Sequence, residues 1–197
     1  MHRLSRALAG IDAANSLDPS RITVDGGETP AELAYGRRMT AMLERVHPEA
    51  SELLRLAVRA QHIRRWEIPR TTYPMDRGGY LRWRKELGRK HAAWTGEIMA
   101  ECGYGDDEIA RVGSLLRKEN LRRDAETQAL EDVAALVFLA HYAADFAGKH
   151  PPEKVVDILA KTLAKMSERG KQAAAALDLP PAVRHALEAA VAQADDP

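Results

Sequence analysis

Two histidines and an aspartate occupy positions where helical periodicity predicts apolar residues. The apolar stripe that passes through Leu54 continues to His62, and a second stripe of aromatic and aliphatic residues includes His91. Asp132 lies in a third segment, 126–148, which is apolar on nearly all faces. A buried carboxylate needs a partner, and the cores of helical bundles are common places for metal sites. We therefore predict that His62, His91 and Asp132 bind a metal ion.

A metal held by imidazole and carboxylate groups would favour hydrolysis of a phosphate ester. Such ligands suit divalent Mn, Fe, Zn or Ni, with Mg as a further choice, and the metal acidifies a bound water or polarises a phosphoryl oxygen. Glu131 or Glu97 would activate the attacking water. Plainer alternatives stay open: each inward histidine could bond the backbone, and Asp132 could pair with Arg64 or Arg65.

Positive charge is concentrated between positions 59 and 90. This segment holds ten Lys and Arg against three acids, whereas the whole chain has 29 of each. The balanced total excludes a globally basic nucleic-acid-binding protein. Arginine binds phosphate through paired hydrogen bonds, although each arginine could equally pair with a nearby acid at little gain in stability. The candidates for binding phosphate are Arg64, Arg65, Arg70, Arg82 and Lys118, and those for stacking on a base are Trp66 and Tyr73.

The single cysteine and the apolar patterning restrict where the protein works. With Cys102 alone, no intrachain disulfide and no cysteine-based zinc site can form, which favours a reducing, cytoplasmic setting. The apolar run at the amino terminus is interrupted by Asp12 before it reaches the length of a signal peptide. No stretch approaches the roughly 18 apolar residues of a membrane span. We therefore expect no membrane association.

The periodicity predicts an all-α fold. A chain of 197 residues with 45% hydrophobic and 29% charged residues fits one globular domain over 1–197. We expect a bundle of seven to eight helices without strands, in which the glycine-rich DGGETP is a loop and the connector 68–79 is long enough to be a lid or a binding loop. The expected helices span about 3–17, 30–46, 48–66, 80–102, 106–118, 126–148, 152–170 and 181–192.

Several motifs resemble an uncharacterised family, domain of unknown function 4202. They are IDAANSLDP near the start, RAQHIRRWEIPR, YPMDRGGYLRWR, QALEDVAALVFL and KTLAKMS. The resemblance covers most of the chain and implies no activity. Within the first motif, Asp12 and Asn15 are weaker candidates for lining the same cavity, while Asp18 before Pro19 is typical of a turn.

A more distant resemblance is to the HD superfamily of metal-dependent phosphohydrolases. Its members have a histidine on one helix, a His-Asp pair on the next and an aspartate on a later helix. Lys118 lies where members often have a further His or Lys, but Ala92 replaces the aspartate of the pair, so Glu97 or Glu131 would have to supply it. The resemblance implies an HD-like helical core. The residues that match in order are His62, His91 and Asp132.

These observations predict a metal-dependent phosphohydrolase that acts on a small phosphorylated, nucleotide-like substrate. The alternative belongs to another class: a non-catalytic helical module that binds nucleic acid, a nucleotide or an acidic partner protein through segment 59–90. The sequence carries no indication of the oligomeric state.

Overall fold

Helices form most of the chain in the computed structural model, which describes residues 2–195. The prediction of an all-α fold is confirmed. The elements fall into two compact units, Met1–Leu121 and Arg122–Pro197, and one domain over 1–197 stays a prediction. The helices are α1 (Arg3–Asn15), α2 (Ala31–Val46), α3 (Glu52–Arg59), α4 (Arg77–Glu101), α5 (Asp106–Leu116), α6 (Ala125–His141), α7 (Ala143–Lys149), α8 (Pro152–Leu163), α9 (Glu168–Ala175) and α10 (Pro181–Asp195), with short 3-10 turns η1 (Arg65–Glu67) and η2 (Arg70–Thr72).

The glycine-rich segment after α1 is a β-hairpin, so the prediction that no strand forms was wrong. Strand β1 (Arg21–Val24) pairs antiparallel with β2 (Gly27–Pro30). The two residues between them, Asp25 and Gly26, have φ values of 50° and 79°. Positive φ at both positions is the hairpin turn that an Asp-Gly pair favours, because its twist matches that of the strands. Strands of four residues are too short for alternation to reveal them.

The third predicted helix, 48–66, is shorter in the structure. Helix α3 begins after Ser51, whose Oγ accepts a hydrogen bond from Leu54 N at 3.0 Å, and it ends at Arg59. The chain then turns, and Arg64 adopts the left-handed conformation with φ of 50°. His62 therefore lies in a turn between α3 and η1 rather than on a helix.

Two other predicted helices are each divided. Segment 126–148 breaks at Tyr142, which ends α6 and starts α7 with a non-helical φ of −129°. Segment 152–170 breaks before Ser167, the N-cap of α9, whose Oγ accepts from Gly170 N at 3.1 Å. A serine cap supplies a partner for an amide at the start of a helix. It therefore marks a new helix inside a run that periodicity alone reads as continuous.

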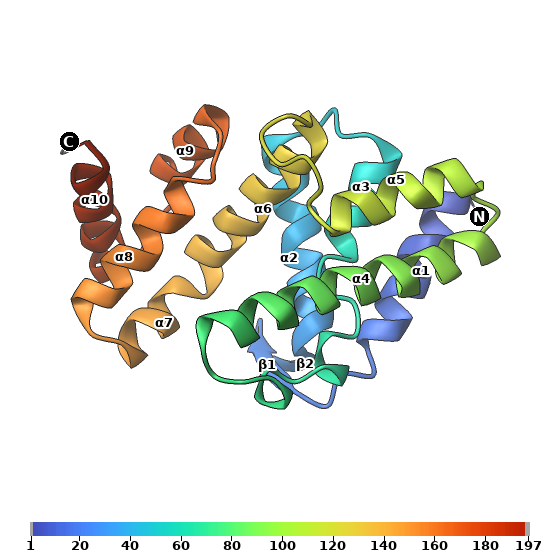
Figure 1. Ribbon diagram of the computed structural model, residues 1–197, viewed down its shortest axis with the longest axis horizontal. Coiled ribbons are helices and arrows are strands. Elements are labelled where there is room, and N and C mark those ends of the chain that lie inside the picture. The colour runs from blue at the N-terminus through green and yellow to red at the C-terminus, as the bar shows by residue number, and fades with distance from the viewer. Residues whose placement is uncertain (1, 196–197) are drawn as a thin grey trace. The chain divides into compact units, whose positions relative to one another are not determined.

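The first unit, residues 1–121, is built around the pairing of α4 with α5. These helices lie side by side (Figure 1), and α3 packs against α1, α2 and α5. Gly10 allows α1 to approach α4 closely, because a Cβ there would lie 2.8 Å from Ile98 Cγ2. The core is mostly aliphatic, as the small number of aromatic residues requires. Its fully buried side chains include Ile11, Met39, Leu43, Leu56, Ile63, Met99 and Leu115.

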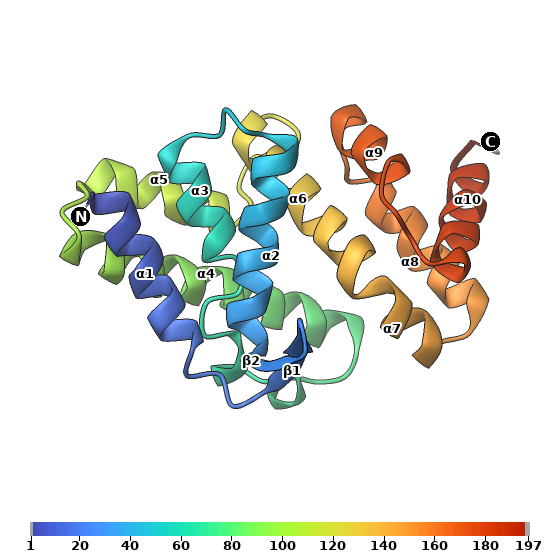
Figure 2. The same ribbon diagram turned by 180° about the vertical axis from the view of Figure 1, so that it is seen from behind.

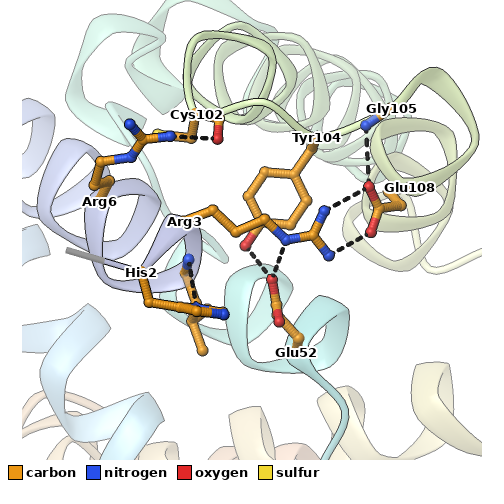
Figure 3. Close-up of polar contacts among 9 residues, drawn as sticks. His2, Arg3, Arg6, Glu52, Cys102, Tyr104, Gly105 and Glu108 are labelled. Carbon is orange, nitrogen blue, oxygen red and sulfur yellow. Dashed lines mark hydrogen bonds and ion pairs between the residues drawn. The ribbon is translucent and has the colours of Figure 1, made fainter.

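Arg3 ties the start of α1 to α3 and α5 (Figure 3). Its guanidinium donates to Glu52 at 2.9 Å and to both oxygens of Glu108 at 2.7 and 3.0 Å. The same group lies 4.2 Å from the ring centre of Tyr104, whose hydroxyl donates to Glu52 at 2.5 Å. Burial raises the pKa of the Tyr104 hydroxyl, so it keeps its proton at physiological pH. These contacts fix α1, which carries Asn15 at its other end.

In the second unit, residues 122–197, α6 packs against α7 and α9, while α10 packs along α8 (Figure 2). Leu130, Leu136, Leu139 and Leu159 are fully buried there. Within residues 2–195, no helix is both long enough and apolar enough to cross a membrane.

Candidate functional site

His62 lies between a carboxyl group and a guanidinium group. Its Nδ1 is 3.1 Å from Glu32 Oε2, and its Nε2 is 2.8 Å from Arg65 Nη1. A guanidinium can only donate hydrogen bonds, so Nε2 must be the acceptor and Nδ1 must carry the proton that is donated to Glu32. The contacts therefore define a neutral imidazole in a single tautomer.

Aromatic rings hold both partners of this contact in place. Tyr35 stacks on the His62 ring with the ring centres 3.8 Å apart and the planes at 8°. The Arg65 guanidinium lies 4.8 Å from the ring centre of Trp83, a cation–π arrangement. Trp83 is fixed in turn because its Nε1 donates to the carbonyl of Ile68 at 2.8 Å. The imidazole and the guanidinium are thus oriented by packing as well as by hydrogen bonds.

Burial sets the protonation of the site, and nearby positive charges modify it. Burial lowers the pKa of His62 well below 6.5, and the positive charges of Arg65, Lys118 and Arg84 lower it further. Burial raises the pKa of Glu32 to about 7, although Arg65 opposes this. Near neutral pH the carboxyl group therefore titrates while the imidazole stays neutral, the reverse of their usual order. Such perturbed pairs are typical of functional sites.

His91 lies next to His62 and has a nitrogen without a partner. The ring centres are 6.3 Å apart, and His91 is only 4% exposed. Its pKa is lowered by burial first and then by His62 and Arg65, while a hydrogen bond with the backbone of Gln61 opposes this. In the described part of the chain Nε2 is buried without a hydrogen-bond partner, so Nδ1 makes the bond to Gln61. Nε2 is therefore a buried hydrogen-bond acceptor that the described residues leave unsatisfied.

A protein-family model matches residues 5–187 of the chain and is described as a domain of unknown function (DUF4202). The chain belongs to this family. No curated protein matches the sequence, and no solved structure matches it. The matched range of this DUF4202 protein includes the whole Glu32–His62–His91 cluster.

The histidines of this DUF4202 protein do not fit a metal ion as they lie. Both ring nitrogens of His62 are occupied, and an ion there would have to displace Arg65 or Glu32. The positive charge of Arg65 also disfavours a cation at the same nitrogen. Nowhere in residues 2–195 do three or more His, Cys, Asp or Glu side chains form a group that could hold a metal. The metal site therefore stays a prediction, and no step below depends on it.

Asp132, the third predicted ligand, belongs to the second unit and is only 2% exposed. Its carboxylate accepts hydrogen bonds from Gln128 Nε2 at 3.0 Å, from Ser167 N at 2.9 Å and from Ser167 Oγ. Gly170 leaves room for this carboxylate, because a Cβ there would lie 2.6 Å from Asp132 Cγ. Asp132 therefore holds the cap of α9, which supplies the partners that burial requires.

The predicted phosphate-binding arginines differ in what they contact. Arg65 contacts His62 directly, and Lys118 acts on His62 through its positive charge. Arg64 instead pairs with Glu67 at 2.6 Å and lies 4.7 Å from the ring centre of Trp94. Arg64 and Arg65, proposed above as alternative partners for Asp132, thus have acidic partners within their own unit.

The remaining predicted residues lie around the cluster or away from it. Arg70 donates to the carbonyls of Tyr73 and Asp76 at 3.0 and 3.2 Å, so it shapes the connector. Arg82 is exposed and forms no ion pair within residues 2–195. Glu97 is exposed and slightly raises the pKa of Arg64. Trp66 and Tyr73 are half-buried in the first unit, and Glu131 is half-buried in the second.

Two residues of the site were missed in the sequence, namely Glu32 and Tyr35. Glu32 and Tyr35 are three residues apart on α2, a spacing that puts a carboxyl and an aromatic ring on one helix face. This pair was a usable signal. A glutamate beside the buried face of a helix needs a polar partner, just as a histidine that points inward does.

Replacing Glu32 with glutamine is expected to raise stability relative to wild type as the pH rises from 4.5 to about 7. A carboxyl group whose pKa is higher in the folded chain than in the unfolded chain binds its proton more tightly when folded. Wild-type stability from this group is therefore full below 4.5 and is lost as the pH rises through 7. The effect is at most about 1.4 kcal/mol per pH unit, and the partial exposure of Glu32 reduces it.

Thermal unfolding of both proteins across this pH range measures the difference in Tm. The gap should widen between pH 4.5 and about 7 and then stay constant. Glu28→Gln, which changes an exposed side chain of β2, is the matched control. A Glu32→Gln gap that is flat across the range would contradict the proposed environment of this carboxyl group.

Proposed function

We propose that the protein is a phosphohydrolase that binds a small phosphorylated, nucleotide-like substrate at Glu32, His62, Arg65 and His91. The observation that carries the proposal is the neutral His62 imidazole held between a carboxyl and a guanidinium group. A general base must be unprotonated and oriented by a third group. Glu32 supplies that orientation, and the positive charge around His62 attracts a phosphate group.

In the proposed reaction, Arg65 moves from His62 Nε2 to the phosphate group, and water attacks phosphorus while the freed Nε2 accepts its proton. The new O–P bond forms as the ester P–O bond breaks, and the protonated His62 then donates the proton to the leaving alcohol. The Arg65 guanidinium has five N–H donors, so it can bind phosphate oxygens when substrate arrives. The unpartnered Nε2 of His91 would accept a hydrogen bond from a hydroxyl or amino group of the substrate. Nucleosides and sugars offer such groups.

The test is release of inorganic phosphate by the full-length protein from a panel of nucleotides and sugar phosphates. We expect at least one compound to be hydrolysed and Arg65→Ala to abolish most of the activity. Arg77→Ala is the matched control, since Arg77 is an exposed cation in the same basic segment. If no compound is hydrolysed, or if both variants behave alike, the proposal fails.

Metal dependence, which the HD resemblance implies, is tested in the same assay. Metal analysis of the purified protein and activity with and without a chelator decide it directly. A stoichiometric metal that is lost in His62→Ala would support the predicted ligands, whereas full activity in chelator would support hydrolysis by the protein's own side chains.

A second candidate function is binding of nucleic acid or an acidic partner through segment 59–90. The observation in its favour is that Arg77, Arg82 and Lys85 are exposed near the start of α4 and form no ion pair within residues 2–195. Binding to single-stranded nucleic acid that weakens steeply as salt is added would support this function. Binding that does not respond to salt would count against it.

A further inference from the structure

Asn15, the last residue of α1, contacts both chain segments that form the candidate site. Its side chain is 1% exposed. The Nδ2 group donates to the carbonyl of Glu32 at 3.4 Å, and Oδ1 accepts from the amide of Arg64 at 3.0 Å. One buried amide thus links the start of α2, which carries Glu32, to the turn that carries His62 and Arg65.

The bond to Arg64 stabilises an unfavourable backbone conformation. Arg64 has φ of 50°, in the left-handed region that residues with a Cβ rarely adopt. Such residues persist where the surrounding contacts hold them. Because Arg64 lies between His62 and Arg65, this conformation determines how the imidazole and the guanidinium approach each other. The Asn15 side chain supplies the partner for the amide at this point.

Asp18 holds the backbone N–H of Glu32, whereas Asn15 holds its carbonyl. It is 2% exposed, and its two oxygens accept from Glu32 N and Ser20 N, both at 2.9 Å. Amides in the first turn of a helix have no partner within the helix. Pro30 precedes α2 and offers no side-chain cap, so Asp18 takes that role. Both the N–H and the C=O of Glu32 are therefore held by residues just before β1.

We propose that Asn15 and Asp18 are positioning residues that hold the Glu32 carboxyl group against His62 Nδ1 and thereby keep the imidazole in one tautomer. Within residues 2–195, neither side chain hydrogen-bonds to His62, and both act through the backbone of Glu32 and Arg64. The consequence for catalysis depends on the proposed function. The positioning itself does not, because it is a property of the free protein.

The test is nitrogen NMR of the histidine rings in the full-length protein without substrate. The chain has seven histidines, and His62→Gln identifies the signal of His62. We expect wild-type His62 to show the Nδ1-protonated tautomer. In Asn15→Ala we expect a mixture of tautomers. Ile11→Val, in the buried core of the same helix, is the control for a general loss of stability and should leave His62 unchanged.

An Asn15→Ala protein that folds and shows the wild-type tautomer would overturn the proposal. Should that variant fail to fold, hydrogen exchange of the wild type decides the matter. The Arg64 amide should then be protected against exchange although it lies in a turn, and rapid exchange there would overturn the proposal as well. Since neither measurement needs a substrate, a positive result together with an inactive wild-type protein would refute the phosphohydrolase function alone.

Discussion

His62→Gln is expected to lower kcat/KM for the phosphorylated substrate by about 10²–10⁴-fold, the usual contribution of a general base. Glutamine has a similar length and can still donate to Glu32 and accept from Arg65. It cannot accept a proton from water, however, so the variant removes the proposed chemistry while it preserves both contacts. Phosphate release under conditions where substrate is limiting gives the ratio directly.

The matched control for this variant is His185→Gln, which changes an exposed histidine of α10. Its activity should equal that of the wild type. Thermal unfolding of His62→Gln should show a folded protein, so that a loss of activity can be assigned to chemistry. A His62→Gln protein that keeps more than about a tenth of wild-type activity would be incompatible with the general-base role.

Asp132→Ala is expected to destabilise the second unit by about 3 kcal/mol. Loss of the carboxylate leaves the Ser167 amide and hydroxyl without their acceptor and removes one of the two hydrogen bonds of the Gln128 amide group. Each unsatisfied buried group costs about 1–3 kcal/mol. Hydrogen exchange of α6 and α9 measures the local loss, because it reports each unit separately. Asp157→Ala is the control, since its ion pair with Lys161 is exposed and worth little.

Gly170→Ala tests the same contact from the opposite helix. Alone it should be strongly destabilising, because the added Cβ would lie 2.6 Å from Asp132 Cγ. In the Asp132→Ala background the collision is absent, so the second change should cost much less. Equal costs in both backgrounds, or an Asp132→Ala protein as stable as Asp157→Ala, would show that Asp132 does not hold the cap of α9.

Periodicity was a good guide to helices and a poor guide to where they stop. Helices α2 and α5 begin within a residue of their predicted starts, because Pro30 and the acidic run after Gly105 mark them in the sequence. The short α3 and the separate α9 were missed. Their limits depend on the left-handed Arg64 and on the Ser167 cap, and each is stabilised by a residue far away in the sequence, Asn15 and Asp132 respectively.

The same limit of periodicity explains which residues of the candidate site were predicted and which were not. A polar residue on an apolar stripe shows that His62 and His91 point inward, and the structure brings these two together. The stripe does not show which group each side chain meets. Glu32 is thirty residues from His62 in the sequence, and its role depends on a turn that periodicity had assigned to a helix. Asp132 was correctly read as buried, but two of its hydrogen-bond donors belong to Ser167, just before α9, and periodicity gives no sign of that contact.

The connector between η1 and α4 was expected to be a lid or a binding loop, and its contacts bear on how ligands reach the site. Arg70 closes it internally, and Trp83 bonds its first residue, Ile68. Gly79 fits so tightly under Pro74 that a Cβ would overlap the carbonyl oxygen. A segment fastened at its start, middle and end is part of the scaffold. Under the proposed function, a substrate would therefore have to reach the site without movement of this connector.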